Sequence, residues 1–255
     1  MINEIIHFAM NSRKLPFLFF FIFISGQSSQ AQLTKKYDYN QSYYQSLRYG
    51  WFKPDQYDKK KLYPLIVYLH GSRDTVSREI QWYQSAVQKE NPSFVLTPKC
   101  ENPDQGWGNT WNANHAPAMA QTLKLIDSLM KVYPIDPDRL YIYGISMGGF
   151  GVFSVLAKEP GKFAAAYAVC GGSDVKVASK LLQTPLWIFH GSVDDVVPVY
   201  LSREVYNEMI KLGGTKVKYT EYPGVKHNSW ENVAEEKSLS TWIFSQTRQS
   251  IKEKE

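Results

Sequence analysis

The sequence lacks the short motifs that hold a metal ion or a dinucleotide. It contains no H-E-x-x-H and no C-x-x-C motif, and no group of His, Cys, Asp and Glu residues has metal-ligand spacing. Its glycines do not form the G-x-G-x-x-G pattern of a dinucleotide-binding turn. We therefore expect a protein that uses no metal and no other cofactor.

An excess of one charge is also missing. The chain of 255 residues carries 29 Lys and Arg against 24 Asp and Glu, which gives a formal net charge of +5. The lysines are scattered rather than gathered into a basic stripe interleaved with aromatic residues. This distribution argues against a nucleic-acid partner.

No apolar run is long enough to cross a bilayer. The run at residues 15–24 has only about ten residues, whereas a membrane-spanning helix needs about 20. It follows two basic residues, and Ser29 and Ala31 supply small side chains at the minus-three and minus-one positions of a signal-peptidase site. We therefore expect residues 1–31 to be a signal peptide.

Cleavage after Ala31 predicts a secreted or periplasmic protein without a stable membrane anchor. Translation could begin at Met1 or at Met10, because a start at Met10 gives a more compact basic region before the apolar run. Removal of two basic and one acidic residue leaves 27 against 23, a formal charge of +4, on residues 32–255. That length suits a single α/β domain.

Short apolar segments alternate with amphipathic segments along this domain, and no internal repeat divides it. The pattern predicts an α/β fold with a mostly parallel, doubly wound sheet of eight strands and helices on both faces. The expected strands are residues 33–40 and 44–53, an antiparallel edge pair, then 64–70, 93–97, 140–143, 163–170, 185–190 and 216–221. The expected helices are residues 76–89, 116–132, 150–158, 202–212 and 230–247.

One stretch, residues 139–151, reads RLYIYGISMGGFG. A strand, a sharp turn and a helix in this order place Ser146 at the turn, in the G-x-S-x-G pattern of a nucleophile elbow. Gly144 and Gly148 let strand and helix approach closely. Ser146 is therefore the expected nucleophile, and a Gly-rich turn without a catalytic role is the alternative.

Two later loops supply the base and the acid that a serine nucleophile needs. The loop after residues 185–190 contains Asp194 and Asp195, and the loop after residues 216–221 contains His227. One aspartate can orient the histidine while the other caps the following helix. The other histidines are less suited, since His7 lies in the expected signal peptide, His115 precedes a helix, and His70 and His190 belong to strand-end His-Gly pairs that are more often structural.

Four stretches together, PLIVYLHGS, DRLYIYGISMGGFG, HGSVDDVVP and YPGVKHNSW, resemble the α/β-hydrolase superfamily. The chain looks like a small secreted carboxylesterase of the feruloyl, acetyl-xylan or polyhydroxyalkanoate-depolymerase type, with prolyl-oligopeptidase-type relatives. The resemblance implies a catalytic triad of Ser146, Asp194 and His227, because the pattern H-G-x-x-D-x-x-V-P selects the first aspartate. Residues 171–184, where larger relatives insert a lid, are too few for a helical cap.

The resemblance also assigns the oxyanion hole to two backbone N–H groups, those of Met147 and Ser72. Trp107, Trp111 and Trp230 are candidate substrate-binding residues at the mouth of the site. The alternative for these tryptophans is that they pack inward and stiffen the loops.

These features predict a serine carboxylesterase that works through an acyl-enzyme. The partner would be an ester, either a small molecule or an acylated polymer such as a plant polysaccharide. A serine peptidase of prolyl-oligopeptidase type is the alternative, because the triad does not distinguish esters from peptides. A non-catalytic binding relative is a third reading.

Cysteine is scarce, with Cys100 and Cys170 alone. Export would permit a disulfide without requiring one. In the usual α/β-hydrolase strand order their strands are separated by two others, about 14 Å, whereas a disulfide needs Cα atoms within about 7 Å. We therefore expect both thiols to be free.

Overall fold

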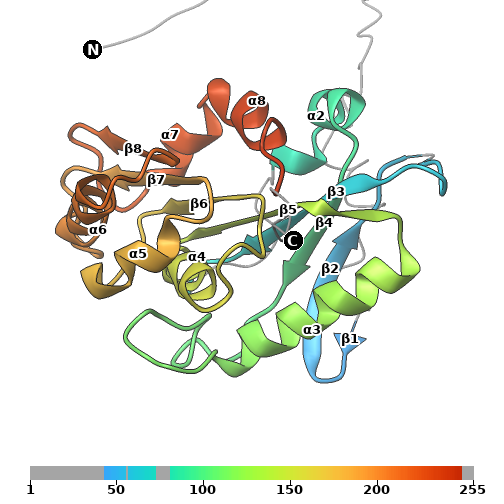
Figure 1. Cartoon of the computed structure of the whole chain (residues 1–255), viewed down its shortest axis with the longest axis horizontal. Coiled ribbons are helices and arrows are strands. Elements are labelled where there is room, and N and C mark those ends of the chain that lie inside the picture. Colours follow the sequence, from blue (N-terminus) through green and yellow to red (C-terminus); the bar gives the residue numbers. More distant parts are fainter. Residues whose placement is uncertain (1–42, 56, 73–80, 249–255) are drawn as a thin grey trace, which may run out of the picture.

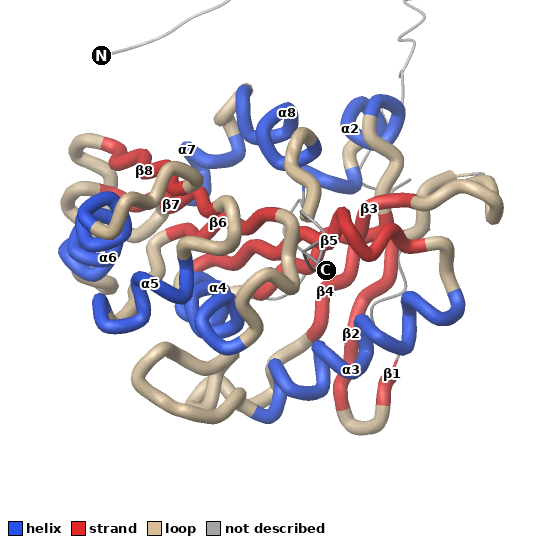
Figure 2. Tube along the Cα trace, viewed as in Figure 1, coloured by secondary structure: helices blue, strands red, loops and turns tan. Residues whose placement is uncertain are grey.

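The computed structural model describes residues 43–55, 57–72 and 81–248 of the chain. Its strands form one sheet in the order β1-β2-β4-β3-β5-β6-β7-β8 (Figure 1, Figure 2). The strands are β1 (Tyr43–Tyr44), β2 (Leu47–Phe52), β3 (Tyr63–Leu69), β4 (Phe94–Pro98), β5 (Ile135–Ile145), β6 (Ala165–Val169), β7 (Leu186–Gly191) and β8 (Val217–Tyr222). The helices are η1 (Gln81–Tyr83), α2 (Ser85–Glu90), α3 (Pro117–Val132), α4 (Met147–Lys158), η2 (Val175–Val177), α5 (Ala178–Leu181), α6 (Tyr200–Lys211), α7 (Trp230–Ala234) and α8 (Ser238–Phe244).

Helices cover both faces of the sheet (Figure 1). On one face, α3, α4 and α6 bury their apolar side chains against the strands in a single core. On the other face, α2, α7 and α8 lie over a second buried cluster that is rich in aromatic residues. The inner strands β3, β6 and β7 are buried almost throughout, as their continuous apolar runs predict.

The predicted mostly parallel, eight-stranded sheet is confirmed. All pairs from β4 through β3, β5, β6 and β7 to β8 are parallel. At one edge, β2 pairs antiparallel with β4, and β1 pairs antiparallel with β2. The edge itself differs from the prediction, because residues 44–53 do not form one strand. Gln45 adopts a left-handed backbone with φ of 54°, which reverses the chain and makes β1 and β2 a hairpin. The strand predicted at residues 33–40 and the signal peptide predicted at 1–31 lie outside the described residues.

The single helix predicted for residues 230–247 is also wrong. Two short helices, α7 and α8, stand in its place. Between them the carboxylate of Glu236 accepts hydrogen bonds from the backbone N–H and the hydroxyl of Ser238, at 3.2 and 2.8 Å. Such local bonds compete with the helical pattern and start a new helix at a different angle. The first part of the helix predicted at 76–89 lies outside the described residues, and its later part is η1 and α2.

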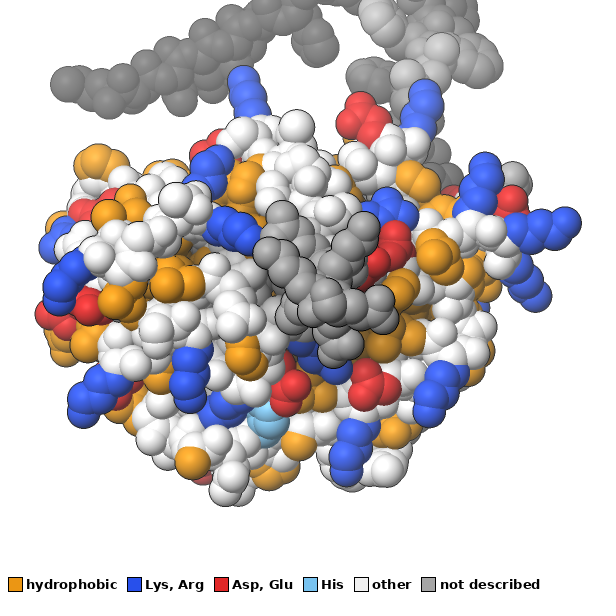
Figure 3. All heavy atoms as spheres, in the orientation of Figure 1, with side chains coloured by type: hydrophobic (Ala, Val, Ile, Leu, Met, Phe, Trp, Pro, Cys, Tyr) orange, Lys and Arg blue, Asp and Glu red, His pale blue; other side chains and the backbone are white. Residues whose placement is uncertain are grey.

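The connection between β6 and β7 carries only η2 and α5, two short turns of helix. The expectation that no large lid is built there is confirmed. Among the described residues, no helix has both the length and the apolar character needed to span a bilayer. On the face shown in Figure 3, basic side chains are spread over the surface among acidic and uncharged ones, and several project together at the right edge.

The cysteines lie where the strand order predicts. Cys100 follows β4 and Cys170 follows β6, and β3 and β5 lie between these strands. Both side chains are buried and neither forms a disulfide. Burial raises the pKa of both thiols, that of Cys170 to about 12.

We therefore expect the unreduced protein to retain two thiols. A thiol-reactive chromophore should titrate two groups per chain after denaturation and far fewer before it, because both side chains are shielded in the fold. A mass two hydrogens below that of the reduced chain would contradict this result.

Candidate active site

Ser146 stands at the sharp turn between β5 and α4. Its backbone has φ of 55° and ψ of −114°, a conformation that is costly for a residue with a side chain. The turn needs glycine on both sides. A Cβ on Gly144 would lie 2.2 Å from the carbonyl oxygen of Gly148, and one on Gly148 would lie 1.9 Å from that of Leu69. The predicted elbow is therefore present, and it holds Ser146 at the C-terminal edge of the sheet.

His227 lies within hydrogen-bonding distance of this serine. It sits in the loop between β8 and α7, and its Nε2 is 2.9 Å from Ser146 Oγ. Its Nδ1 is 2.8 Å from Oδ2 and 3.0 Å from Oδ1 of Asp194, which lies in the loop after β7. Because an ionised carboxylate only accepts hydrogen bonds, Nδ1 carries the proton and Nε2 can accept the proton of the serine. The fold thus brings the three residues together from three separate loops.

The carboxylate of Asp194 has no exposed surface and is held by hydrogen bonds. Besides the histidine, its Oδ1 accepts from the backbone N–H groups of Val196 and Val197, at 2.9 and 2.8 Å. Asp195 is instead 54% exposed, and its hydrogen bond with Lys226 lowers its pKa. Of the two aspartates, only Asp194 contacts the histidine.

The two predicted oxyanion donors border the serine. Met147 is the first residue of α4, so its N–H has no carbonyl partner within the helix and lies at the positive end of the helix dipole. Ser72 follows β3, and its neighbour Gly71 lies against the elbow, because a Cβ there would be 3.8 Å from Ser146 Cβ. The role of these two N–H groups in an oxyanion hole stays a prediction.

The prediction that Trp107 binds substrate is wrong. Its side chain is fully buried, and its Nε1 donates a hydrogen bond to the backbone oxygen of His70 at 3.0 Å. The loop that carries it folds back against α4, where Asn109 accepts hydrogen bonds from Ser154 and Lys158. A large ring whose single N–H is satisfied packs well inside, so Trp107 stabilises this loop.

Trp111 and Trp230 are better placed. Trp111 is 52% exposed and lies beside Phe150 of α4, with ring centroids 6.1 Å apart. Trp230 is half-buried, and its ring meets that of His227 edge-on at 5.7 Å between centroids. Trp230 therefore leaves an aromatic surface beside His227, and Trp111 leaves one beside the first turn of α4.

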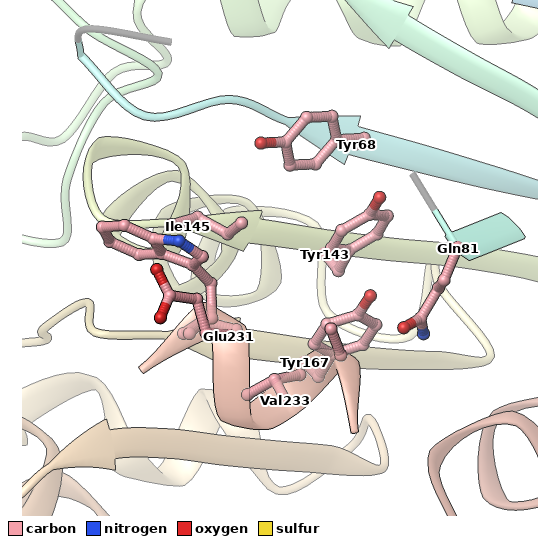
Figure 4. Close-up of a pocket in the computed structure, with 10 residues that line it drawn as sticks. Tyr68, Gln81, Tyr143, Ile145, Tyr167, Glu231 and Val233 are labelled. Atoms are coloured by element: carbon pink, nitrogen blue, oxygen red, sulfur yellow. The ribbon is translucent and has the colours of Figure 1, made fainter. Parts of the chain in front are cut away.

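A cavity of about 490 Å³ lies beside Trp230 (Figure 4). Its lining includes Ile145, the residue before the serine, and Trp230. Three tyrosines from neighbouring strands stack along it, Tyr68 on Tyr143 at 4.7 Å and Tyr143 on Tyr167 at 4.5 Å between ring centroids. Ser146 and His227 do not line the cavity, which therefore offers aromatic surfaces beside the residue before the nucleophile.

Within the described residues, one group of side chains could hold a metal ion. Ligand atoms of Cys170, Asp194 and His227 lie within 4.8 Å of one another. The carboxylate and the imidazole are already joined by a hydrogen bond of 2.8 Å. The thiol is held in its neutral form by burial, which makes it a poor ligand.

Sequence reasoning missed two neighbours of the triad, Cys170 and His190. Cys170 directly follows β6, the strand beside β5, and no spacing along the chain reveals its contact with the triad. His190 was expected to be structural, yet its Nε2 lies 3.2 Å from Oδ2 of Asp194. The one feature of the sequence that could have indicated this contact is that His190 precedes Asp194 by four residues.

Comparisons with known proteins agree with this geometry. A sequence profile of the phospholipase/carboxylesterase family matches residues 56–243. A bifunctional acetylxylan esterase/xylanase of Neocallimastix patriciarum is 33% identical over 141 residues, which are 52% of this chain and 20% of that protein. Dipeptidyl-peptidase 5 of Porphyromonas gingivalis is 30% identical over 126 residues, which are 46% of this chain and 18% of that protein.

The crystal structure of a thermostable esterase shares 32% sequence identity with this chain and aligns with a TM-score of 0.76. The alignment covers 85% of this chain and 64% of the other. The chain therefore spans a fifth or less of the two curated relatives and under two thirds of this solved structure.

Substitution of the triad should separate its members from their neighbours. Ser146→Ala and His227→Ala should each lower kcat for a p-nitrophenyl ester by about 10⁴ or more, because the residues act as a unit. Asp194→Asn should lower it by about 10³ to 10⁴, since the histidine loses the partner that fixes its tautomer.

The matched control is Asp195→Asn, which removes the adjacent, exposed carboxylate and should change kcat only slightly. Circular dichroism would establish that each variant folds. A larger loss in Asp195→Asn than in Asp194→Asn would overturn the assignment of the acid.

Proposed function

The chain belongs to the phospholipase/carboxylesterase family and has its α/β-hydrolase fold, and from this premise we propose that it is a serine esterase that cleaves carboxylic esters through an acyl-enzyme. One observation carries the proposal. Ser146, His227 and Asp194 form a continuous hydrogen-bonded chain on a strained elbow, at 2.9 and 2.8 Å. This geometry activates a serine hydroxyl, which is otherwise a weak nucleophile at neutral pH.

The chemistry follows from the positions of the protons. Ser146 Oγ attacks the ester carbonyl carbon while its proton moves to His227 Nε2, and the carbonyl oxygen becomes an oxyanion that the N–H of Met147 stabilises. The tetrahedral intermediate expels the alcohol, which takes the proton from Nε2. Water then attacks the acyl-serine with the same histidine as base, and the acid and the free serine are released.

The site suits an acyl group carried on a larger molecule. No large lid stands between β6 and β7, and Trp111 with Phe150 leaves an exposed aromatic surface beside the elbow. Aromatic rings stack on sugar and aryl faces and bury area at low entropic cost. The similarity to an acetylxylan esterase supports an acylated polysaccharide as the substrate.

We also propose that the enzyme is exported from the cytoplasm. The predicted signal peptide at residues 1–31 would carry the enzyme out of the cytoplasm, to the periplasm or beyond, where polymeric substrates are found.

Peptide hydrolysis is the second candidate. The similarity to a dipeptidyl-peptidase supports it, because the same triad attacks amides as well as esters. The oxyanion hole and the base are shared by both reactions, so the substrate pocket decides between them.

A substrate panel tests the proposal directly. The mature protein should release acetate from acetylated xylan and p-nitrophenol from p-nitrophenyl acetate, and Ser146→Ala should release neither. Aminoacyl and dipeptidyl anilides should be cleaved at least about 10²-fold more slowly, because anilides demand protonation of a poorer leaving group. Faster cleavage of the anilides would favour the peptidase, and no turnover of any member would refute both.

The polymer hypothesis makes a separate prediction. Trp111→Ala should raise KM for acetylated xylan several-fold and leave kcat/KM for p-nitrophenyl acetate nearly unchanged, because only the polymer reaches this exposed ring. Leu62→Ala is the matched control. Leu62 is also exposed, at 55%, but it lies at the N-terminal end of β3, whereas Ser146 follows the C-terminal end of β5. Equal effects of Trp111→Ala on both substrates would contradict a polymer-binding role.

A further inference from the structure

His190 lies directly behind the acid of the triad, and the mechanism above does not use it. It is near the end of β7, and its side chain has no exposed surface. Its Nε2 is 3.0 Å from the backbone oxygen of Val197 and 3.2 Å from Oδ2 of Asp194. Its Nδ1 is 2.8 Å from Ser202 Oγ of α6, whose hydroxyl is also 3.1 Å from the backbone oxygen of Gly171.

These contacts fix the tautomer of His190. Two acceptors face Nε2, a carbonyl and a carboxylate, so this nitrogen carries a proton. Burial lowers the pKa of His190, and the ring is therefore neutral at neutral pH. In the neutral ring Nδ1 is an acceptor, so the single proton of the Ser202 hydroxyl is shared between Nδ1 and the backbone oxygen of Gly171.

We propose that His190 is a positioning residue of the triad, which donates from Nε2 to Asp194 and Val197 and thereby fixes the carboxylate in the orientation that serves His227. The proposal rests on the proposed esterase function. His190 also connects both ends of the turn from 194 to 197 to strand β7.

The lone pairs of the carboxylate are fully used in this arrangement. Oδ1 accepts from the backbone N–H groups of Val196 and Val197, while Oδ2 faces the imidazole of His227 on one side and that of His190 on the other. A carboxylate offers about four acceptor positions. Without His190, Oδ2 would keep only its contact with His227, and the carboxylate would be held less firmly in the orientation that this hydrogen bond needs.

Other charged groups near His190 are engaged elsewhere. Glu221 lies opposite it on β8, where it pairs with Arg203 and accepts from Tyr219. The thiol of Cys170 is uncharged at neutral pH. The contact with Oδ2 of Asp194 on the side away from His227 is therefore assigned to Nε2 of His190.

Two amide variants test whether the N–H group must stand at the place of Nε2 or whether any polar side chain at position 190 suffices. The amide of His190→Gln reaches the place of Nε2 and can still donate to Asp194, whereas the shorter amide of His190→Asn reaches only the place of Nδ1, near Ser202. The readout is the second-order rate at which a fluorophosphonate probe labels Ser146. In this reaction an O–P bond forms, the P–F bond breaks, and fluoride leaves as the serine proton passes to His227.

We expect His190→Asn to lower the labelling rate by about 10- to 100-fold, the range for loss of a hydrogen bond to a charged group. His190→Gln should retain the rate within a few-fold. His115→Leu is the control, because His115 pairs with Glu159 at the C-terminal end of α4, away from the elbow, and its loss should leave the rate unchanged. Thermal denaturation would verify that all variants are folded at the assay temperature.

A second arm tests whether the effect passes through the acid. In an Asp194→Asn background, His190→Asn should lower the labelling rate by less than about three-fold, because the carboxylate that it positions is gone. Equal rates for His190→Asn and His190→Gln, or a full additional loss in the Asp194→Asn background, would overturn the proposal. The probe reacts with any activated serine, so a negative ester panel with normal labelling refutes the esterase function and leaves this inference intact.

Discussion

The backbone conformation of Ser146 is the constraint on which the rest of the site depends. A residue with a side chain at φ of 55° is costly, and it persists only where its surroundings leave no alternative. Here α4 packs so closely on β5 and β3 that Gly144 and Gly148 admit no Cβ, and the parallel pairing of β5 with β3 and β6 holds the strand end in place. The serine is consequently presented to the edge of the sheet rather than buried beneath it.

Parallel pairing then determines what can reach the serine. The C-terminal ends of β3, β5, β7 and β8 meet at one edge, so the loops that follow them bring Gly71, Asp194 and His227 around Ser146. A buried carboxylate is tolerated in this place only because each of its oxygens is hydrogen-bonded. This need for hydrogen-bond donors is the basis of the role proposed for His190, because its Nε2 lies 3.2 Å from Oδ2 of Asp194 and comes from strand β7 rather than from the loop.

The errors of prediction share a cause. Trp107 and Trp111 lie four residues apart in one Gly-rich loop, and nothing in their local sequence distinguishes them. Trp107 is fully buried because the loop folds against α4, whereas Trp111 lies on the outer side of the same loop and is 52% exposed. The division of the last helix into α7 and α8 depends on a hydrogen bond between Glu236 and Ser238 that competes with regular helix geometry.

The sequence by itself determined the alternation of strands and helices, the elbow and the order of serine, acid and base, because these follow from local patterns of apolar residues and glycine. It also predicted Asp194 over Asp195 through a family pattern, which the hydrogen bond to His227 agrees with. Only the tertiary structure decided that Trp107 is part of the core, that Cys170 borders the triad and that His190 supports Asp194. These contacts join residues of different strands and loops, and their distances are set by how the sheet and helices pack, which no spacing along the chain encodes.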